Sequence, residues 1–186
     1  MIQSDRQIAW WCLKHEMIKP YSEKLIGRAE RAISYGPSSY GYDITLSDEF
    51  KVIADPDDVL DPKTITEKHY RTFKSKEPVL IEPQGFMLGA SVERFKMPRN
   101  MIGLATNKST YARLGLDASK TTVLEPGWEG TLTIELSNHG QNPMVVHPGE
   151  GILQVLFFKA ADECELSYED RSGKYQLQSG VTIPRI

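Results

Sequence analysis

The stretch LEPGWEGTLTIELSN, residues 124–138, contains the pattern that decides the fold. Its second half is predicted to be a strand, because two kinds of side chain alternate along it and a strand points successive side chains to opposite faces. One face takes Leu132, Ile134 and Leu136, and the other takes Thr131, Thr133, Glu135 and Ser137. We expect this strand to be largely buried and to belong to a β-rich core.

Further short strands are predicted around it, separated by proline, glycine or asparagine. They cover residues 44–46, 50–54, 79–83, 86–92, 101–106, 144–147 and 152–158. One N-terminal helix is predicted over about residues 5–15, because Ser4 and Gln7 have the spacing of a capping box. Many short strands with few helices predict a mainly β fold, either a sandwich of the jelly-roll type or a distorted barrel.

Two segments lack a clear strand pattern. Residues 55–78 are polar and charged, and we expect an excursion with at most one short helix. The tail, from about residue 165 to residue 186, is polar with glycines and without strong periodicity. The length of 186 residues favours one domain, so we expect a single unit over residues 1–186 that ends in this tail.

Composition excludes several classes of protein. The net charge is −3 and the pI is about 5.8, and no lysine and arginine cluster indicates a nucleic-acid track. The two cysteines, Cys12 and Cys164, are far apart in the sequence, as in proteins of a reducing compartment. We find no signal peptide and no apolar run that could span a membrane, so we expect a cytoplasmic protein without a membrane or nucleic-acid partner.

The segment KSTYARLGL, residues 108–116, gathers polar groups beside an apolar stretch. Lys108, Ser109, Thr110 and Arg113 lie within six positions and are predicted to begin a short helical turn. A buried carboxylate is costly unless it is paired. We therefore expect Arg113 to pair with Glu135.

Several blocks in the same order resemble the dCTP deaminase family of the trimeric dUTPase-like superfamily. They are SSYGYD, KSTYARLGL, EPGWEGTLTIELSN, the glutamine of GILQVLFF and the tail segment GKYQLQSGVT. The resemblance extends over nearly the whole chain. It implies a distorted barrel or jelly-roll-like sandwich that assembles as a homotrimer, with active sites shared between subunits.

The resemblance also implies hydrolytic deamination of dCTP to dUTP and ammonia, which supplies dUTP for thymidylate synthesis. Magnesium is expected on the triphosphate, and dTTP is a possible inhibitor. No zinc is expected, because zinc deaminases need an HxE segment and a PCxxC pair, and this sequence has no CxxC. Two alternatives stay open: a bifunctional enzyme that also cleaves dUTP to dUMP, and a nucleotide-binding regulator without turnover.

Three residues match the family's catalytic positions. Glu135 would be the general base, which takes a proton from the water that attacks C4 and later delivers protons to the leaving amine. Ser109 would hold that water. Arg113 would keep Glu135 ionised and stabilise charge as the tetrahedral centre forms.

Other positions match substrate contacts of the family. Together with the three catalytic residues, the predicted substrate-binding positions are Lys108, Ser109, Thr110, Tyr111, Ala112, Arg113, Glu125, Thr133, Ile134, Glu135, Gln154, Tyr168, Lys174 and Gln178. In the family the tail folds over the triphosphate as a lid. Lys108 stands where the family commonly has an arginine, and Glu125 where it commonly has an aspartate. The loop DASKTTVL, residues 117–124, differs from the usual family loop in length and composition.

Each functional interpretation has a structural alternative. Glu135 and Arg113 are also consistent with a buried ion pair that only stabilises the fold. Ser109 and Thr110 are also consistent with helix capping. For Trp128, packing in the core or at an interface is favoured over stacking on a ligand.

Overall fold

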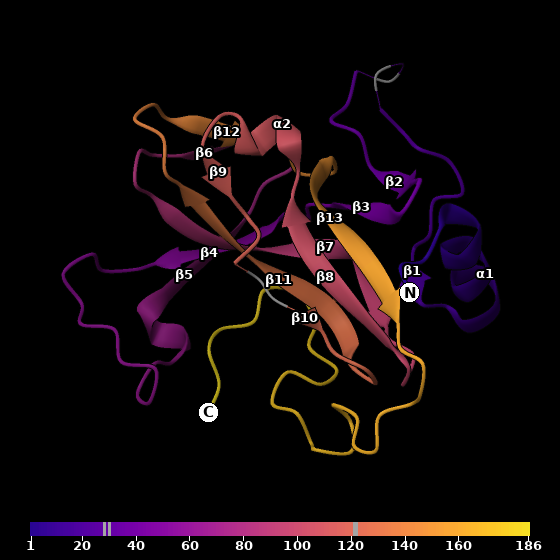
Figure 1. Cartoon of the computed structure of the whole chain (residues 1–186). Helices are drawn as coiled ribbons and strands as arrows, with labels where there is room; N and C mark the ends of the chain where they lie inside the picture. The colour runs from indigo at the N-terminus through magenta and orange to yellow at the C-terminus, as the bar shows by residue number, and fades with distance from the viewer. Residues whose placement is uncertain (28, 30, 121–122) are drawn as a thin grey trace.

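Two antiparallel sheets form the body of the molecule in the computed structural model, which describes residues 1–186 except 28, 30, 121 and 122 (Figure 1). The first sheet runs β5 (Tyr70–Lys74), β4 (Glu49–Ile53), β7 (Phe86–Lys96), β11 (Glu129–Asn138) and β9 (Leu116–Asp117), and β1 (Ile18–Lys19) also pairs with β7. The second runs β10 (Val123–Leu124), β8 (Met101–Asn107), β13 (Gly151–Lys159), β3 (Gly41–Thr45) and β2 (Gly36–Ser38). A separate pair joins β12 (Met144–Val146) to β6 (Val79–Ile81).

The strand β11 has the alternation that its sequence predicts. Leu132, Ile134 and Leu136 are buried in the core, whereas Thr133 and Glu135 on the other face are partly exposed. The register against β7 shifts between Thr131 and Thr133, so a bulge lies next to the exposed threonine. One strand therefore connects the core to the outer face that carries Glu135.

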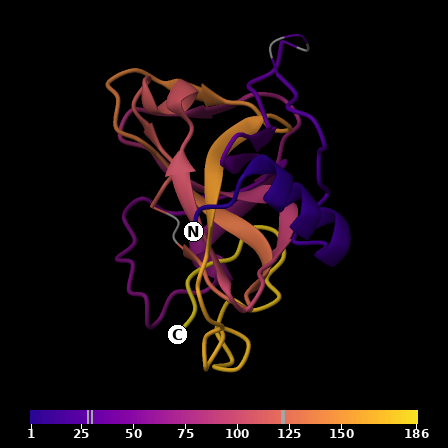
Figure 2. The ribbon, with the colours of Figure 1, turned by 45° about the vertical axis from the view of Figure 1, so that its right-hand side comes forward.

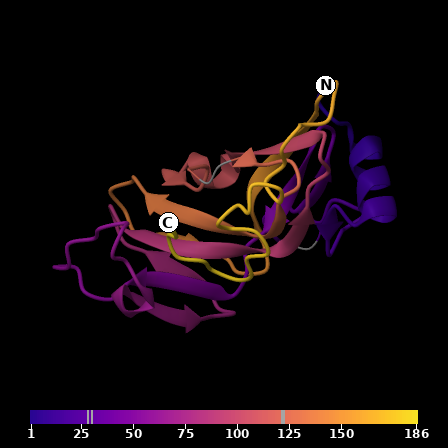
Figure 3. The ribbon, with the colours of Figure 1, turned by 90° about the horizontal axis from the view of Figure 1, so that it is seen from below.

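Helices are few and short. The helix α1 (Asp5–His15) begins at the predicted capping box of Ser4 and Gln7, and it lies at one side of the sandwich (Figure 3). It packs there through the buried Ile8 and Cys12. Among the described residues, the others are the 3-10 helix η2 (Glu67–His69) and the single turn α2 (Ser109–Ala112). None of the helices in the described part of the chain is long and apolar enough to cross a membrane.

A buried carboxyl group joins the two sheets. Glu93 of β7 is 2% exposed, and its carboxyl accepts hydrogen bonds from the backbone N–H of Thr45 at 2.9 Å and from the Thr45 hydroxyl at 2.7 Å. Thr45 is the last residue of β3 in the opposite sheet. Burial raises the pKa of Glu93 to about 7, and the two bonds from Thr45 oppose that rise.

Each of the eight predicted strands overlaps a strand of the structure, with differences at the ends, whereas the short strands β1, β2, β9 and β10 were not predicted. The mainly β, sandwich-like fold and the N-terminal helix are confirmed. The excursion over residues 55–78 contains η2, as expected, but also β5, which the sequence did not predict. Residues 34–43, dense in turn formers, make the hairpin of β2 and β3.

The first prediction concerns Glu93. The folded protein binds this proton more tightly than the unfolded chain, so the contribution of Glu93 to stability is complete below pH 4.5 and is lost as pH rises through about 7. The variant Glu93→Gln keeps one acceptor and one donor for Thr45 but does not titrate. We expect it to match the wild type near pH 5 and to exceed it at pH 8 by on the order of 3 kcal/mol. Urea unfolding at one protein concentration and several pH values measures this, and parallel profiles for the two proteins would contradict it.

Candidate active site

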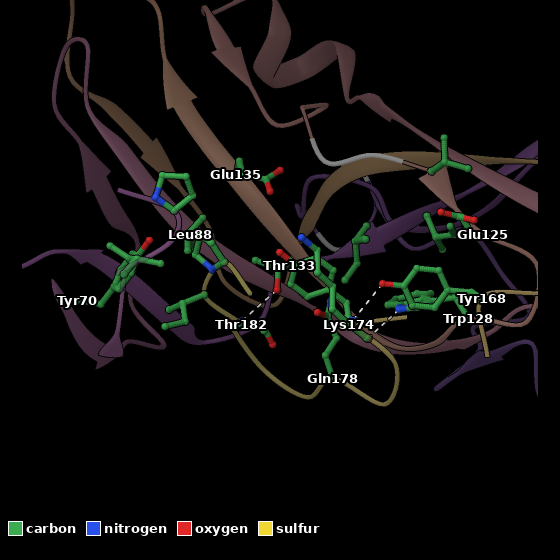
Figure 4. A pocket seen from close by; sticks show the side chains of 18 of the residues that line it. Tyr70, Leu88, Glu125, Trp128, Thr133, Glu135, Tyr168, Lys174, Gln178 and Thr182 are labelled. Atoms are coloured by element: carbon green, nitrogen blue, oxygen red, sulfur yellow. Dashed lines mark hydrogen bonds between the residues drawn. The ribbon is translucent and has the colours of Figure 1, made fainter. Parts of the chain in front are cut away.

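A pocket of about 720 Å³ opens on the outer face of β11 and β7 (Figure 4). Four parts of the chain enclose it: the strands β11 and β7, the segment from Val123 to Trp128, the excursion after β4 and the C-terminal tail. The excursion contributes Leu60, Asp61, Pro62 and Ile65, and the tail contributes residues from Tyr168 to Pro184. Segments far apart in the sequence therefore make one enclosure.

The strand β11 places Thr133 and Glu135 in this pocket, where both side chains are seen to point (Figure 4). Glu135 is half-buried, so its carboxylate is accessible to a ligand although its neighbours Ile134 and Leu136 are in the core. The expectation of a largely buried strand holds for the opposite face only. A carboxylate held on a rigid strand at the wall of a pocket can accept a proton from a bound water.

The tail is attached along β11 by main-chain contacts. The backbone N–H of Leu177 donates to the carbonyl of Glu129 at 2.7 Å, and that of Thr131 donates to the carbonyl of Gln178 at 3.1 Å. The Gln178 amide donates to the Thr131 carbonyl at 2.7 Å. Further along, the N–H of Thr182 donates to the Thr133 hydroxyl at 3.1 Å, so this part of the tail is also held at the edge of the pocket (Figure 4).

The segment EPGWEG is shaped to receive the tail. A Cβ on Gly127, which has φ +76°, would meet the Cβ of Ser167 at 2.7 Å, and a Cβ on Gly130 would meet the carbonyl of Gln178 at 2.9 Å. Between them Trp128 is buried, and its indole N–H donates to the Tyr175 carbonyl at 3.0 Å. Two glycines and one tryptophan therefore set how closely the tail approaches.

The far end of the pocket combines Glu125, Trp128 and Tyr168 (Figure 4). The Tyr168 hydroxyl accepts a hydrogen bond from the Tyr175 N–H at 3.0 Å, which fixes the turn before Lys174. Lys174 lines the same pocket and lies 5.3 Å from the centre of the Tyr175 ring. Glu125 forms an ion pair with Arg171 of the tail. The tail thus brings two cations to a wall that carries carboxylates.

The structure brings together six of the residues predicted to bind substrate or to act in catalysis. They are Glu125, Thr133, Glu135, Tyr168, Lys174 and Gln178. The remaining predicted residues lie outside the lining of this pocket. In Figures 1 and 2 the α2 motif is at the upper end of the sandwich and the tail at the lower end.

Two of the remaining residues form a buried polar network. The Lys108 ammonium is paired with Asp43 at 2.5 Å, and both side chains are 9% exposed. The Gln154 amide donates to Asp43 at 3.1 Å and to the Ser38 hydroxyl at 3.0 Å. Within one chain Lys108 therefore faces an interior carboxylate, and its contribution is to hold the start of α2 against β3 and β13.

The other predicted residues divide into core and surface. Ile134 is buried, and the buried Tyr111 accepts a hydrogen bond from the His147 N–H at 3.1 Å. Burial raises the pKa of Tyr111 to about 12. Ser109, Thr110, Ala112 and Arg113 are exposed on α2 and its C-terminal end.

Part of the loop of residues 117–124 lies outside the described residues, because Thr121 and Thr122 are not among them. In the ranges that the structure does describe, His, Cys, Asp and Glu side chains form no group of three or more that could hold a metal ion. Both cysteines there are free thiols.

Sequence reasoning missed several residues of the pocket. Leu60 and Ile65 fall in the excursion that was treated as polar. Trp128 is buried in the core, as the favoured packing interpretation predicts, and it also lines the pocket. Tyr175 was not singled out, although it is next to the expected Lys174. Arg171, which pairs with the lining residue Glu125 from outside the pocket, was not singled out either. The glycines of EPGWEG were the available signal, since a glycine often marks a close approach of another backbone.

Comparison with known proteins first defines the class of fold. The 2'-deoxycytidine 5'-triphosphate deaminase of Agrobacterium tumefaciens superposes with a TM-score of 0.62 at 20% identity, over 84% of this chain and 47% of that chain. This chain therefore spans about half the length of that protein. At this identity the match supports the fold, a sandwich of the kind seen in that deaminase.

The family follows from sequence. A family model described as dCTP deaminase-like matches residues 2–160. The chain is 45% identical to the dCTP deaminase of Acinetobacter baylyi over 99% of this chain and 98% of the relative. It is 44% identical to the dCTP deaminase of Pseudomonas savastanoi pv. phaseolicola with the same coverages. The chain belongs to the dCTP deaminase-like family.

The second prediction tests how Trp128 holds the tail. The variant Trp128→Phe removes the indole N–H and leaves the Tyr175 carbonyl without this donor. We expect tail docking to weaken by about 1 kcal/mol, which raises tryptic cleavage after Lys174 roughly fivefold. The matched control is Trp10→Phe on the exposed side of α1. Equal cleavage rates for both variants would contradict the proposed contact.

Proposed function

We propose that this chain hydrolyses the exocyclic amine of dCTP and releases dUTP and ammonia. One observation carries the proposal: Glu135, at the position of the family's catalytic glutamate, lies at the wall of a pocket that the tail encloses with Lys174. Membership of the family supports the same reaction. The product would supply dUTP for thymidylate synthesis.

Glu135 is proposed as the general base and acid. Its carboxylate takes a proton from water as the oxygen attacks C4 of cytosine, and the C4 centre becomes tetrahedral. Addition moves an electron pair to N3. The abstracted proton then passes to the exocyclic nitrogen, which leaves as ammonia, and the proton of the C4 hydroxyl passes to N3 as C4 becomes a carbonyl. Thr133, on the same face of β11, borders the space for the base.

The tail, from about residue 165, is proposed as the lid of a single domain. Lys174 and Gln178 supply a cation and an amide that suit phosphate oxygens, and Tyr168 lines the same end. Magnesium is proposed to arrive on the triphosphate, whose own oxygens are ligands that Mg²⁺ prefers.

A homotrimer with shared sites is proposed to bring Ser109 and Arg113 to the pocket. Ile102, Leu104 and Val123, on adjacent strands β8 and β10, are 39%, 40% and 44% exposed. Across β8, Ile102 pairs with Phe158 and Leu104 with Leu156, so this outer sheet face is apolar. Apolar patches of this kind mark interfaces. An assembly through this face carries the exposed α2 motif of one subunit towards the pocket of another.

Two further parts of the proposal concern the regulation of the enzyme and its cellular compartment. dTTP, which shares the sugar and triphosphate of the substrate, is proposed as a possible inhibitor at the same pocket. The cytoplasm is proposed as the compartment, and the two free cysteines accord with it.

The third prediction identifies the reaction. Incubated with dCTP and magnesium, the purified protein is expected to accumulate dUTP, and Glu135→Gln is expected to lose activity at least a thousandfold while it still binds dCTP. Chromatography of the nucleotides and calorimetric titration measure the two effects. Appearance of dUMP would favour the bifunctional alternative. Intact dCTP, or turnover by Glu135→Gln, would contradict the proposal.

The fourth prediction tests the shared site. Glu135→Gln and Arg113→Ala are each expected to be inactive, because each lacks one half of every site. When the two proteins are unfolded together and refolded as mixed trimers, about a quarter of the sites combine the intact halves and activity returns to that level. Light scattering checks the trimer. No recovery in trimers that are shown to be mixed would place both residues in one subunit.

A further inference from the structure

Arg171 contacts the candidate site from outside the pocket. Its guanidinium pairs with one carboxylate oxygen of Glu125, whereas Arg171 itself is not among the lining residues. Glu125 does line the pocket, next to Trp128 and Tyr168 (Figure 4). An arginine of the tail therefore holds a carboxylate of the body that faces the pocket.

The guanidinium of Arg171 is held on three sides. Besides Glu125, its Nε donates to the Ser167 carbonyl at 3.4 Å, and its Cζ lies 5.7 Å from the centre of the Tyr168 ring. The backbone N–H of Arg171 also donates to the Ser167 carbonyl at 3.1 Å. A side chain restrained in this way loses little entropy when it pairs, so the ion pair has a defined geometry.

A second ion pair anchors the same turn to the body independently of Glu125. Arg99 pairs with Asp170 at 2.7 Å and donates to the Ser167 hydroxyl at 3.2 Å. Ser167 is buried, and its N–H and hydroxyl both donate to Asp170 at 2.9 Å. The turn is thus fixed by Arg99, which leaves Arg171 free to act on Glu125.

The charge of the pocket explains why such a pair is useful. Glu125 and Glu135 both face the pocket in which the anionic nucleotide would bind, and like charges repel. An arginine that engages one oxygen of Glu125 neutralises its charge. The other oxygen can still accept a hydrogen bond from a neutral donor.

We propose that Arg171 is a positioning residue for substrate recognition: it fixes and neutralises Glu125, which then accepts a hydrogen bond from a hydroxyl or amino group of the deoxynucleotide. The proposal rests on the proposed function for the identity of that ligand. The contact itself is independent of turnover.

The test is a double-mutant cycle on the full chain with Arg171→Gln, Glu125→Gln and both together. Arg171→Gln is expected to raise KM for dCTP about three- to tenfold with little change in kcat, and Arg171→Lys to recover part of the loss. In the Glu125→Gln background, Arg171→Gln is expected to change KM less than twofold. The control Arg6→Gln, on exposed α1, is expected to leave KM unchanged.

Hydrogen exchange of residues 167–178 in the nucleotide-free protein gives a readout that does not need activity. Each single substitution is expected to speed hydrogen exchange in these residues. The double variant is expected to exchange no faster than either single variant. If this coupling holds and dCTP is not converted, the proposed function fails and the contact stands. Additive effects on KM and on exchange, an unchanged KM, or a loss confined to kcat would overturn the role of Arg171.

Discussion

The alternation of side chains along β11 is the constraint on which the rest of the structure depends. Ile134 and Leu136 are completely buried, so the strand cannot slip by one residue without moving the core to solvent. The same constraint points Thr133 and Glu135 outward, and the tail then pairs with the exposed edge of the strand near Gly130. Core packing, the position of the candidate base and the docking site of the tail are therefore set by one register.

Buried ionisable side chains connect separate parts of the sandwich to one another. Glu93 links β7 to Thr45 of β3 across the two sheets, and its burial costs free energy at neutral pH that the bonds from Thr45 partly offset. Lys108 and Asp43 compensate each other, which fixes the start of α2. Within one chain, Lys108, which the sequence analysis placed among the substrate contacts, therefore has a structural contact. The exposed Ser109 and Arg113 keep the orientation that this contact imposes.

Patterns with a short period could be predicted from the sequence. The capping box before α1, the strands and the alternation of residues 131–137 depend on neighbouring residues, and they agree with the structure. The strand β5 was missed because YRTFK is polar and acquires its role by pairing with β4. The ion pair of Arg171 and Glu125 joins residues 46 positions apart, and the tail has no periodicity to indicate it. Contacts of this kind depend on the fold, so local sequence does not reveal them.

The distribution of charge gives the tail a role beyond that of a cover. The walls contributed by the body carry carboxylates, namely Glu125, Glu135 and Asp61, and a pocket with these alone would repel a polyanion. The tail brings Lys174 to the lining and Arg171 to Glu125. Docking of the tail therefore changes the pocket from acidic to nearly balanced. A triphosphate and the tail then favour each other's binding, because each supplies charge that the other needs.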